Sequence, residues 1–380
     1  MFFDEAPKRD IRDLYDYREE LDQLVEAVKG GARLIVIDGQ RRTGKTSLLL
    51  TALGRIGQPS IVIDAREFAS AATITRRDLI QALERGLNKF LTENRSWRDR
   101  LSTVFKGLRG VEVEPGLPPR ISLKWGGRRG EILDLASVLE AIGREAESQG
   151  TIVLLALDEA QEFRRLAGLN LSVLMAHVYD YVKGIRWIVT GSQVGMLNDF
   201  LGVDDPKAPL FGRALTRIRL KRLSYESSME FLKLGFIQIP LTIDDRQIST
   251  IVEKLDGIIG WLTYAGVVSR RLKRYDEDVL AEAARLGSEL AASEFTNFLS
   301  LRPQAKSRYV QIMRSMIEGP RQWSEIKRFL ENSGGHTIPD FTFNQLLSNI
   351  VKGGYVEKRP EKQYEISDPL LHQATKGRLF

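Results

Sequence analysis

Residues 36–49 read VIDGQRRTGKTSLL, in which an apolar run leads into a polar segment between two glycines, Gly39 and Gly44. The eight residues that start at Gly39 fit the pattern G-x-x-x-x-G-K-[ST] at every fixed position, and they lie between a predicted strand and a predicted helix. Glycine lets the backbone curl so that successive amide N–H groups point inward, and the following helix adds the positive end of its dipole. The stretch therefore predicts a loop that binds phosphate groups.

The side chains of this loop predict a triphosphate ligand with magnesium. We expect Lys45 to reach the β- and γ-phosphates and the Thr46 hydroxyl to hold Mg²⁺. The residues expected around the phosphates are Gly39, Gln40, Arg41, Arg42, Thr43, Gly44, Lys45, Thr46 and Ser47. A chance match to the pattern would occur in roughly one or two of a hundred chains of this length. The flanking strand and helix favour phosphate binding over that alternative.

Five short runs rich in Ile, Val and Leu predict buried strands, because they lack the strict alternation of a strand with one wet face. They are residues 33–38, 60–64, 151–158, 185–191 and 217–220. Apolar residues three or four positions apart predict helices between them, at 18–29, 45–55, 75–93, 131–149 and 170–183. This order predicts an α/β fold with a mostly parallel sheet covered on both faces. Residues 107–127 alternate around a Pro/Gly-rich centre, which predicts a surface hairpin.

A pair of carboxylates follows the third predicted strand, in TIVLLALDEAQEF at 151–163. Asp158 and Glu159 fall at the carboxyl end of that strand, where ligands collect in open α/β sheets. We expect Asp158 to bind Mg²⁺ through water, and Glu159 to orient and deprotonate an attacking water. Alone, Asp-Glu after a strand is more often the acidic first turn of a helix. Together with the phosphate loop, the pair favours catalysis.

Two further polar segments follow in the strand order. IVTGSQ at 188–193 puts Thr190, Ser192 and Gln193 at the end of the next strand, beside the expected γ-phosphate. One of them is expected to sense that phosphate, with Ser192 as the candidate, although a turn role for Gly191-Ser192 explains the sequence nearly as well. Arg213 in LFGRAL is a candidate for stabilising charge on the transferring phosphate, from the same chain or a neighbouring subunit. An arginine in a basic protein is more often solvated.

After residue 222 the pattern changes to short helices. Residues 223–300 predict a small helical domain that follows a sheet domain at 1–222. Residues 301–380 predict three helices and a β-hairpin, the outline of a winged helix-turn-helix. Residues 300–380 hold 13 Lys or Arg against 8 Asp or Glu, a balance of +5, and the whole chain carries +6. A basic end suggests nucleic acid or another acidic partner, although solvated surfaces of this charge are common.

The amino-acid composition excludes several kinds of catalytic and metal-binding site. The 380 residues include no cysteine, which excludes disulfides, thiolate nucleophiles and Cys-based zinc sites. His177, His336 and His372 are scattered, so the metal we expect is Mg²⁺ held with a phosphate ligand. Hydrophobic residues make up 43%, and no apolar run approaches the roughly 18 residues that span a bilayer. The first ten residues lack a secretory signal, so we expect a cytoplasmic protein with no membrane partner.

Several segments, in this order, make the chain resemble the archaeal P-loop ATPases related to the STAND and AAA+ classes. They are DYREELDQL, GQRRTGKTSLL, LLALDEAQEF, WIVTGSQVGML, FGRALTRIRLKRLSYESSMEFL and DGIIGWLTYAG, and the resemblance covers essentially the whole length. It implies a parallel-sheet P-loop NTPase domain of the AAA+/ASCE type, then a small helical lid and a winged helix-turn-helix domain. It also implies ATP as the nucleotide, with Arg18 and Glu19 over the adenine base. Relatives usually carry Gly-x-Pro in the lid, but here Ile259 replaces the proline, so the nucleotide contact of the lid is left open.

Three functions fit these features. The leading hypothesis is a slow ATPase switch, in which the lid and winged helix couple the bound ATP or ADP to a protein partner. The alternative is a DNA-handling ATPase similar in layout to replication initiators, which would contact duplex DNA with weak sequence specificity. The residues available for that contact are Asn344, Gln345, Ser348, Asn349, Lys352, Lys358, Arg359 and Lys362. The third is a non-catalytic module with a structural nucleotide, against which Glu159 argues. The oligomeric state is left open.

Overall fold

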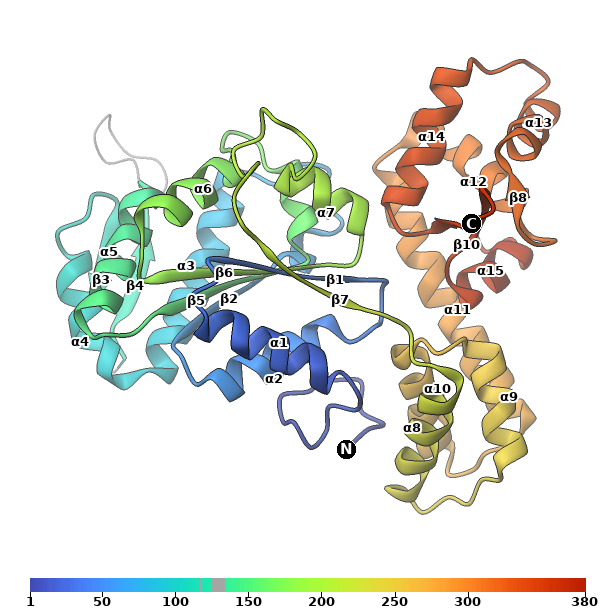
Figure 1. Cartoon of the computed structure of the whole chain (residues 1–380), viewed down its shortest axis with the longest axis horizontal. Coiled ribbons are helices and arrows are strands. Elements are labelled where there is room, and N and C mark those ends of the chain that lie inside the picture. The colour runs from blue at the N-terminus through green and yellow to red at the C-terminus, as the bar shows by residue number, and fades with distance from the viewer. Residues whose placement is uncertain (117, 125–133) are drawn as a thin grey trace.

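The computed structural model describes residues 1–116, 118–124 and 134–380, and a five-stranded sheet organises the first half of the chain (Figure 1). The strands all pair in parallel, in the order β2-β5-β6-β1-β7. Their bounds are β1 Leu34–Gly39, β2 Ser60–Asp64, β5 Val153–Asp158, β6 Ile185–Gly191 and β7 Thr216–Leu220. The predicted parallel sheet is confirmed. Because the strands run the same way, the carboxyl ends of β1, β5 and β6 meet at one edge.

Helices cover both faces of the sheet, because successive strand residues point to opposite sides. Ile35 and Ile37 belong to a core with one set of helices, and Leu34 and Val36 belong to a second core. The first set is α1 Arg18–Lys29 and α2 Lys45–Ile56. The second set is α3 Arg76–Glu93, α4 Arg95–Phe105, α5 Leu135–Ser148, α6 Leu171–Tyr181 and α7 Val194–Leu201. The first core continues beyond the sheet into the C-terminal helices, so the parts of the chain share one apolar interior.

The segment between β2 and β5 carries the predicted hairpin. Strands β3 Val111–Glu114 and β4 Arg120–Leu123 pair antiparallel, and Asn88 of α3 binds both backbone groups of Ile121. Residue 117 and residues 125–127 of the predicted hairpin lie outside the described residues, as do the first three residues of the helix predicted at 131–149. Short helices α4 and α7 were not predicted. Three turns of 3₁₀-helix also occur, at η1 Ala65–Phe68, η2 Ala160–Arg165 and η3 Pro303–Ala305.

A helical unit, which we call the lid, follows β7. Its helices are α8 Tyr225–Ile237, α9 Asp245–Leu255, α10 Ile259–Leu272 and the long α11 Glu277–Ser300. Ser224 begins the first of them, because its hydroxyl accepts a hydrogen bond from the amide of Ser227 at 3.0 Å. The lid also binds the start of the chain. Phe3 is fully buried and meets the rings of Phe231 and Phe236 of α8 edge to face.

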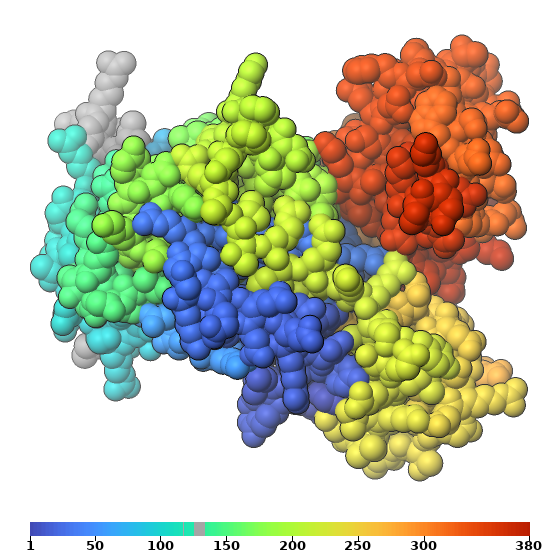
Figure 2. Space-filling view, in the orientation of Figure 1, coloured from blue at the N-terminus to red at the C-terminus, as the bar shows by residue number. Residues whose placement is uncertain are grey.

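The last unit is a winged helix, as predicted. Helices α12 Lys306–Arg314, α13 Trp323–Gly334 and α14 Asp340–Lys352 precede a small sheet in the order β8-β10-β9. The strands of that sheet are β8 Arg321–Gln322, β9 Val356–Lys358 and β10 Gln363–Ile366. An unpredicted helix, α15 Pro369–Lys376, packs on α11 of the lid. Figure 2 shows the lid and the winged-helix unit together along one flank of the sheet domain.

Among the described residues, no helix is long and apolar enough to cross a membrane.

We predict that Phe3→Ala releases the N-terminal segment from the lid. Deleting a buried phenyl ring costs about 3–5 kcal/mol, which exceeds what a short terminal segment can supply from its remaining contacts. Amide exchange at residues 2–8 should therefore become fast. Ile237→Ala is the matched control, since Ile237 lies on α8 but is 79% exposed. Exchange in the Phe3 variant as slow as in the wild type would contradict the prediction.

Candidate active site

The phosphate loop turns sharply between β1 and α2, and its glycines make the turn sterically allowed. Gly39 has φ +153°, and a Cβ atom there would lie 2.4 Å from the carbonyl oxygen of Leu220. Gly44 has φ +89° immediately before the first residue of α2. A residue with a side chain would adopt a strained backbone conformation at either position. The backbone therefore curls where the sequence pattern placed the loop.

Lys45 lies at the closed end of the loop. Its side chain is buried, and its Nζ donates a hydrogen bond to the carbonyl oxygen of Gln40 at 2.5 Å. Burial lowers the pKa of Lys45 to about 8, and the nearby charge of Glu159 opposes part of that shift. A bound anion would favour the charged amine. Lys45 therefore lies where it can bind a phosphate group, and the phosphate charge would offset the cost of burying the ammonium group.

A hydroxyl and a carboxylate face each other beside Lys45. The Thr46 hydroxyl donates to Asp158 Oδ2 at 2.8 Å, and the Thr190 hydroxyl donates to the other oxygen of Asp158. Burial raises the pKa of Asp158, while the hydrogen bond from Thr190 lowers it. A hydroxyl with a carboxylate is the pair that Mg²⁺ takes in phosphate loops. The residues present therefore fit a phosphate-bound Mg²⁺, and no cluster of three or more metal-binding side chains occurs elsewhere in the described chain.

Hydrogen bonds hold the backbone of Glu159 and one oxygen of its carboxylate. Its backbone is left-handed, with φ +55°, and its amide donates to the Thr190 hydroxyl at 3.0 Å. Its Oε2 accepts from the Ser192 hydroxyl and from Gln161 Nε2, both at 2.5 Å. Burial raises the pKa of Glu159, but Lys45 and these donors outweigh it, so the pKa lies below its usual value. The side chain is therefore an ionised carboxylate able to accept a proton.

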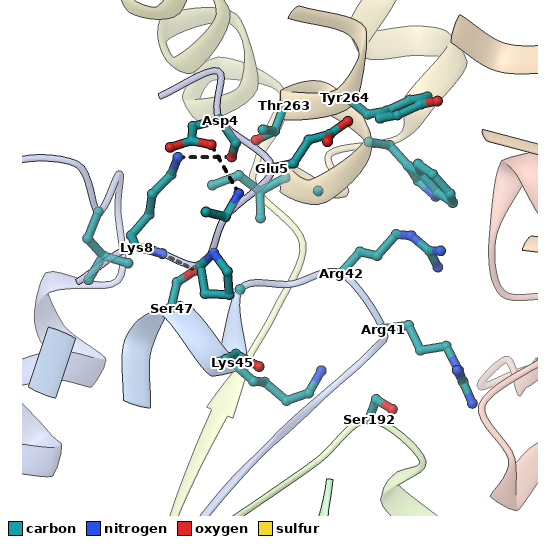
Figure 3. A pocket seen from close by; sticks show the side chains of 18 of the residues that line it. Asp4, Glu5, Lys8, Arg41, Arg42, Lys45, Ser47, Ser192, Thr263 and Tyr264 are labelled. Atoms are coloured by element: carbon teal, nitrogen blue, oxygen red, sulfur yellow. Dashed lines mark hydrogen bonds between the residues drawn. The ribbon is translucent and has the colours of Figure 1, made fainter. Parts of the chain in front are cut away.

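Lys45, Thr46, Glu159 and Ser192 line one cavity of about 710 Å³ between the sheet edge, the lid and the N-terminal segment. Figure 3 shows Lys45 and Ser192 at one end, with Asp4 and Tyr264 at the other. The cavity is also lined by apolar and aromatic residues, against which a nucleotide base can pack. They are Phe2, Leu14, Tyr15, Tyr17, Phe231, Ile259 and Tyr264. The lid residue Ile259 thus reaches the cavity wall although it is not proline.

Some predicted site residues lie outside this cavity. Arg18 and Glu19 are exposed at the start of α1 and do not line the cavity. Tyr17 takes the place expected for Arg18, because its left-handed backbone, with φ +53°, turns the ring inward and Arg18 outward. Arg213 also lies outside the cavity, since its guanidinium is bonded to Asp180 of α6 and to the carbonyl oxygen of Pro209. A role for Arg213 at the cavity of its own chain has no support in this arrangement.

Loop residues 40–42 contact the C-terminal units, and Arg41 and Arg42 also line the cavity. Gln40 Nε2 donates to the carbonyl oxygen of Ser367 at 2.6 Å. Arg42 binds both oxygens of Glu294 on α11, at 3.0 and 2.6 Å, and Arg41 binds the same carboxylate at 3.3 Å. No local signal marked Glu294, because it lies some 250 positions away and meets the loop only through folding.

Comparison with known proteins agrees with this architecture. Residues 16–182 match the AAA ATPase domain model, and residues 303–367 match the model of the MCM protein C-terminal winged helix-turn-helix domain. The Walker-type ATPase PABY2304 of Pyrococcus abyssi is 31% identical over 99% of this chain and 100% of that chain, with a TM-score of 0.78. The ORC2 protein of Aeropyrum pernix is 14% identical over 99% and 96%, with a TM-score of 0.60, a likeness of fold. No curated protein matches the sequence.

We predict that ADP affinity, measured without magnesium, falls as the pH rises above about 8. In the free protein Lys45 loses its proton near that pH, and a bound phosphate raises its pKa, so binding above pH 8 takes up a proton. Affinity should be constant below pH 8 and then drop by up to tenfold per pH unit. Calorimetry between pH 7 and 9.5 measures this slope. Lys45→Arg keeps its charge throughout, so its profile should be flat, and a flat wild-type profile would contradict the prediction.

Proposed function

Because the chain belongs to the family of P-loop ATPases that join an AAA ATPase domain to a C-terminal winged helix, we propose that it is a slow ATP-hydrolysing switch. In this proposal the lid and the winged-helix unit transmit the nucleotide state to a partner. The observation that carries it is the contact between the phosphate loop and both C-terminal units. Three successive loop residues, Gln40, Arg41 and Arg42, each bind the lid or the winged helix.

The contacts run in two directions from the loop. Toward the lid, the amide of Gly260 donates to the Arg42 carbonyl oxygen at 2.9 Å, and the Arg42 guanidinium lies 4.0 Å from the centre of the Trp261 ring. Toward the winged helix, Arg41 lies over the Tyr355 ring and donates to its hydroxyl at 3.3 Å. A shift of the loop on nucleotide binding would therefore move both units.

Competition between charged groups would cause the loop to shift when a nucleotide binds. Burial raises the pKa of Glu294, but Arg41 and Arg42 hold it below its usual value, so the three groups form an ionised cluster. The buried Nε of Arg41 has no hydrogen-bond partner in the described structure. A triphosphate in the loop brings several negative charges close to these guanidinium groups and competes with Glu294 for them. The number of phosphates would then set how firmly α11 and the winged helix are held.

Hydrolysis is assigned to groups of the same cavity. Glu159 accepts a proton from the attacking water, and Ser192 and Gln161 hold its carboxylate in place. Lys45 neutralises charge on the phosphate chain. ATP and Mg²⁺ are the expected ligands, and bound Mg²⁺, held by Thr46 with Asp158 behind it, would neutralise charge on the phosphate oxygens. The ionised Glu159 favours hydrolysis over a purely structural nucleotide.

A second candidate function is binding to duplex DNA, which the match to a winged helix-turn-helix model favours. The exposed face of α14 carries Asn344, Gln345 and Ser348, whose side chains can read base edges. The end of that helix packs on α7, where Lys352 binds Asp199 at 2.8 Å. DNA binding would therefore require the end of α14 to leave α7. A flat binding curve with duplex DNA at low salt would rule this function out.

We predict that Lys45→Ala and Glu159→Gln abolish turnover in different ways. Lys45→Ala removes the phosphate contact, so ATP binding should fail. Glu159→Gln keeps the shape but cannot take up a proton, so binding should persist while turnover falls at least about 100-fold. ADP release under multiple-turnover conditions and calorimetry separate the two effects. Glu26→Gln, on the exposed face of α1, is the control. Wild-type turnover in either site variant would overturn the proposal.

We predict that Glu294→Gln uncouples the loop from the C-terminal units. The change keeps the size of the side chain and removes its charge, which frees Arg41 and Arg42 for phosphate. Affinity for ADP and for a non-hydrolysable ATP analogue should rise about tenfold, the scale of one charge-assisted hydrogen bond. Amide exchange at residues 355–376 should also become faster.

Glu289→Gln is the matched control for that variant, because Glu289 lies on the same helix, is half-exposed and binds Arg285 of its own helix. Nucleotide affinity and exchange that both stay at wild-type values in Glu294→Gln would contradict the coupling.

A further inference from the structure

Arg66 is a second cation at the phosphate end of the cavity, and the sequence motifs did not mark it. It lies in η1, directly after β2, and it lines the cavity together with Lys45, Glu159 and Ser192. Strand β2 pairs with β5 so that Asp64 stands opposite Asp158. The register of the sheet thus carries Arg66 to the edge where the carboxylates lie.

The guanidinium is oriented by its neighbour Asp64. Arg66 Nε and Nη2 form a fork on that carboxylate, at 2.9 and 2.6 Å, and the Arg66 amide donates to the same group at 2.9 Å. A bidentate fork fixes the plane of a guanidinium better than a single hydrogen bond. Arg66 is therefore pre-oriented although half of its side chain is exposed.

The guanidinium also lies close to Asp158, the carboxylate expected beside the γ-phosphate. Arg66 Nη2 lies 3.4 Å from Asp158 Oδ2, the oxygen that accepts the hydrogen bond from Thr46. The hydroxyl of Thr46 follows Lys45 at the start of α2, where the phosphate chain would end. Arg213 forms a similar fork, on Asp180 of α6, but it lies outside the cavity.

We propose that Arg66 is a catalytic residue that binds the γ-phosphoryl oxygens in cis, with Asp64 as its positioning residue. The proposal rests on the ATPase function given above. In the reaction the oxygen of water forms a bond to the γ-phosphorus, the bond to the β-bridging oxygen breaks, and ADP leaves with the electron pair. The proton of the water passes to Glu159. Arg66 neither gains nor loses a proton, and its donors stabilise the charge on the transferring oxygens.

A purely structural role of Arg66 and a catalytic role predict different effects on ligand affinity. If Arg66 served only to neutralise the buried Asp158, its loss would lower thermal stability and weaken ADP and transition-state mimics equally. If it binds the transferring phosphoryl group, its loss should spare ADP and weaken only ligands that fill the γ-position. The comparison of two ligands therefore separates the two roles without measuring turnover.

The test uses the full chain with Arg66→Ala, Arg66→Lys and Asp64→Asn, each checked for folding by its melting curve. Calorimetry with magnesium compares ADP alone with ADP plus aluminium fluoride, a mimic of the phosphoryl group in transfer. In Arg66→Ala we expect ADP affinity within about threefold of wild type and mimic affinity lowered at least about 100-fold, with kcat lowered about 10²–10³-fold. Arg66→Lys and Asp64→Asn should lose less. Arg77→Ala, on the exposed part of α3, should behave as wild type.

Two results would overturn the proposal: equal losses for ADP and for the mimic, or no loss for the mimic in a folded Arg66→Ala. A mixture of Arg66→Ala and Lys45→Ala chains tests the cis assignment, because recovered turnover would mean that Arg66 serves a neighbouring copy. Absent turnover in the wild type would contradict the ATPase function instead, and the binding comparison would still decide the role of Arg66.

Discussion

Parallel pairing of β1, β5 and β6 is the constraint on which the site depends. It brings the loop after β1, the carboxylates after β5 and the polar turn after β6 to one edge, although the loop is more than a hundred residues from the other two. The pairing of Asp64 with Asp158 extends that edge to β2 and so brings Arg66 within reach. One register shift in any of these pairs would move its side chains to the other face. Alternate strand residues pack into the two cores. The pairing that directs them there therefore also sets the positions of the site residues.

The edge holds more charge than a protein interior accepts without compensation. Burial disfavours the charged forms of Lys45, Asp158 and Glu159. The opposite charges and the surrounding hydrogen-bond donors offset that cost. Beneath the loop, Asp38 is fully buried and binds Arg217 and Arg219 of β7 at 3.1 and 2.9 Å. In this network each charge is paired with an opposite charge or a hydrogen-bond donor. An added phosphate charge would compete for those partners. That competition connects phosphate binding to the contacts that Arg41 and Arg42 make with Glu294.

The sequence predicted local features well and distant contacts poorly. The loop and the five strands follow from patterns within about ten residues, because glycine geometry and strand burial are local properties. Glu294 and Arg66 carry no such pattern, since their roles arise only when the sheet and lid assemble. Helix α15 was not predicted, although Asp368 and Pro369 form a recognisable helix start. Tyr17 and not Arg18 lines the cavity, and the left-handed backbone of Tyr17 carries no sequence pattern that predicts it.

The isoleucine in the lid shows how a departure from a family pattern can leave the geometry intact. Ile259 is the first residue of α10, a position where proline is also favoured, so the helix starts at the same place with either residue. The contact with the loop comes instead from the next two positions, the amide of Gly260 and the ring of Trp261. A Cβ atom at Gly260 would lie 2.6 Å from the Cβ of Arg42, so glycine is the residue that permits the close approach. The lid is therefore held to the phosphate loop by Gly260 and Trp261, and the side chain of Ile259 before them lines the cavity.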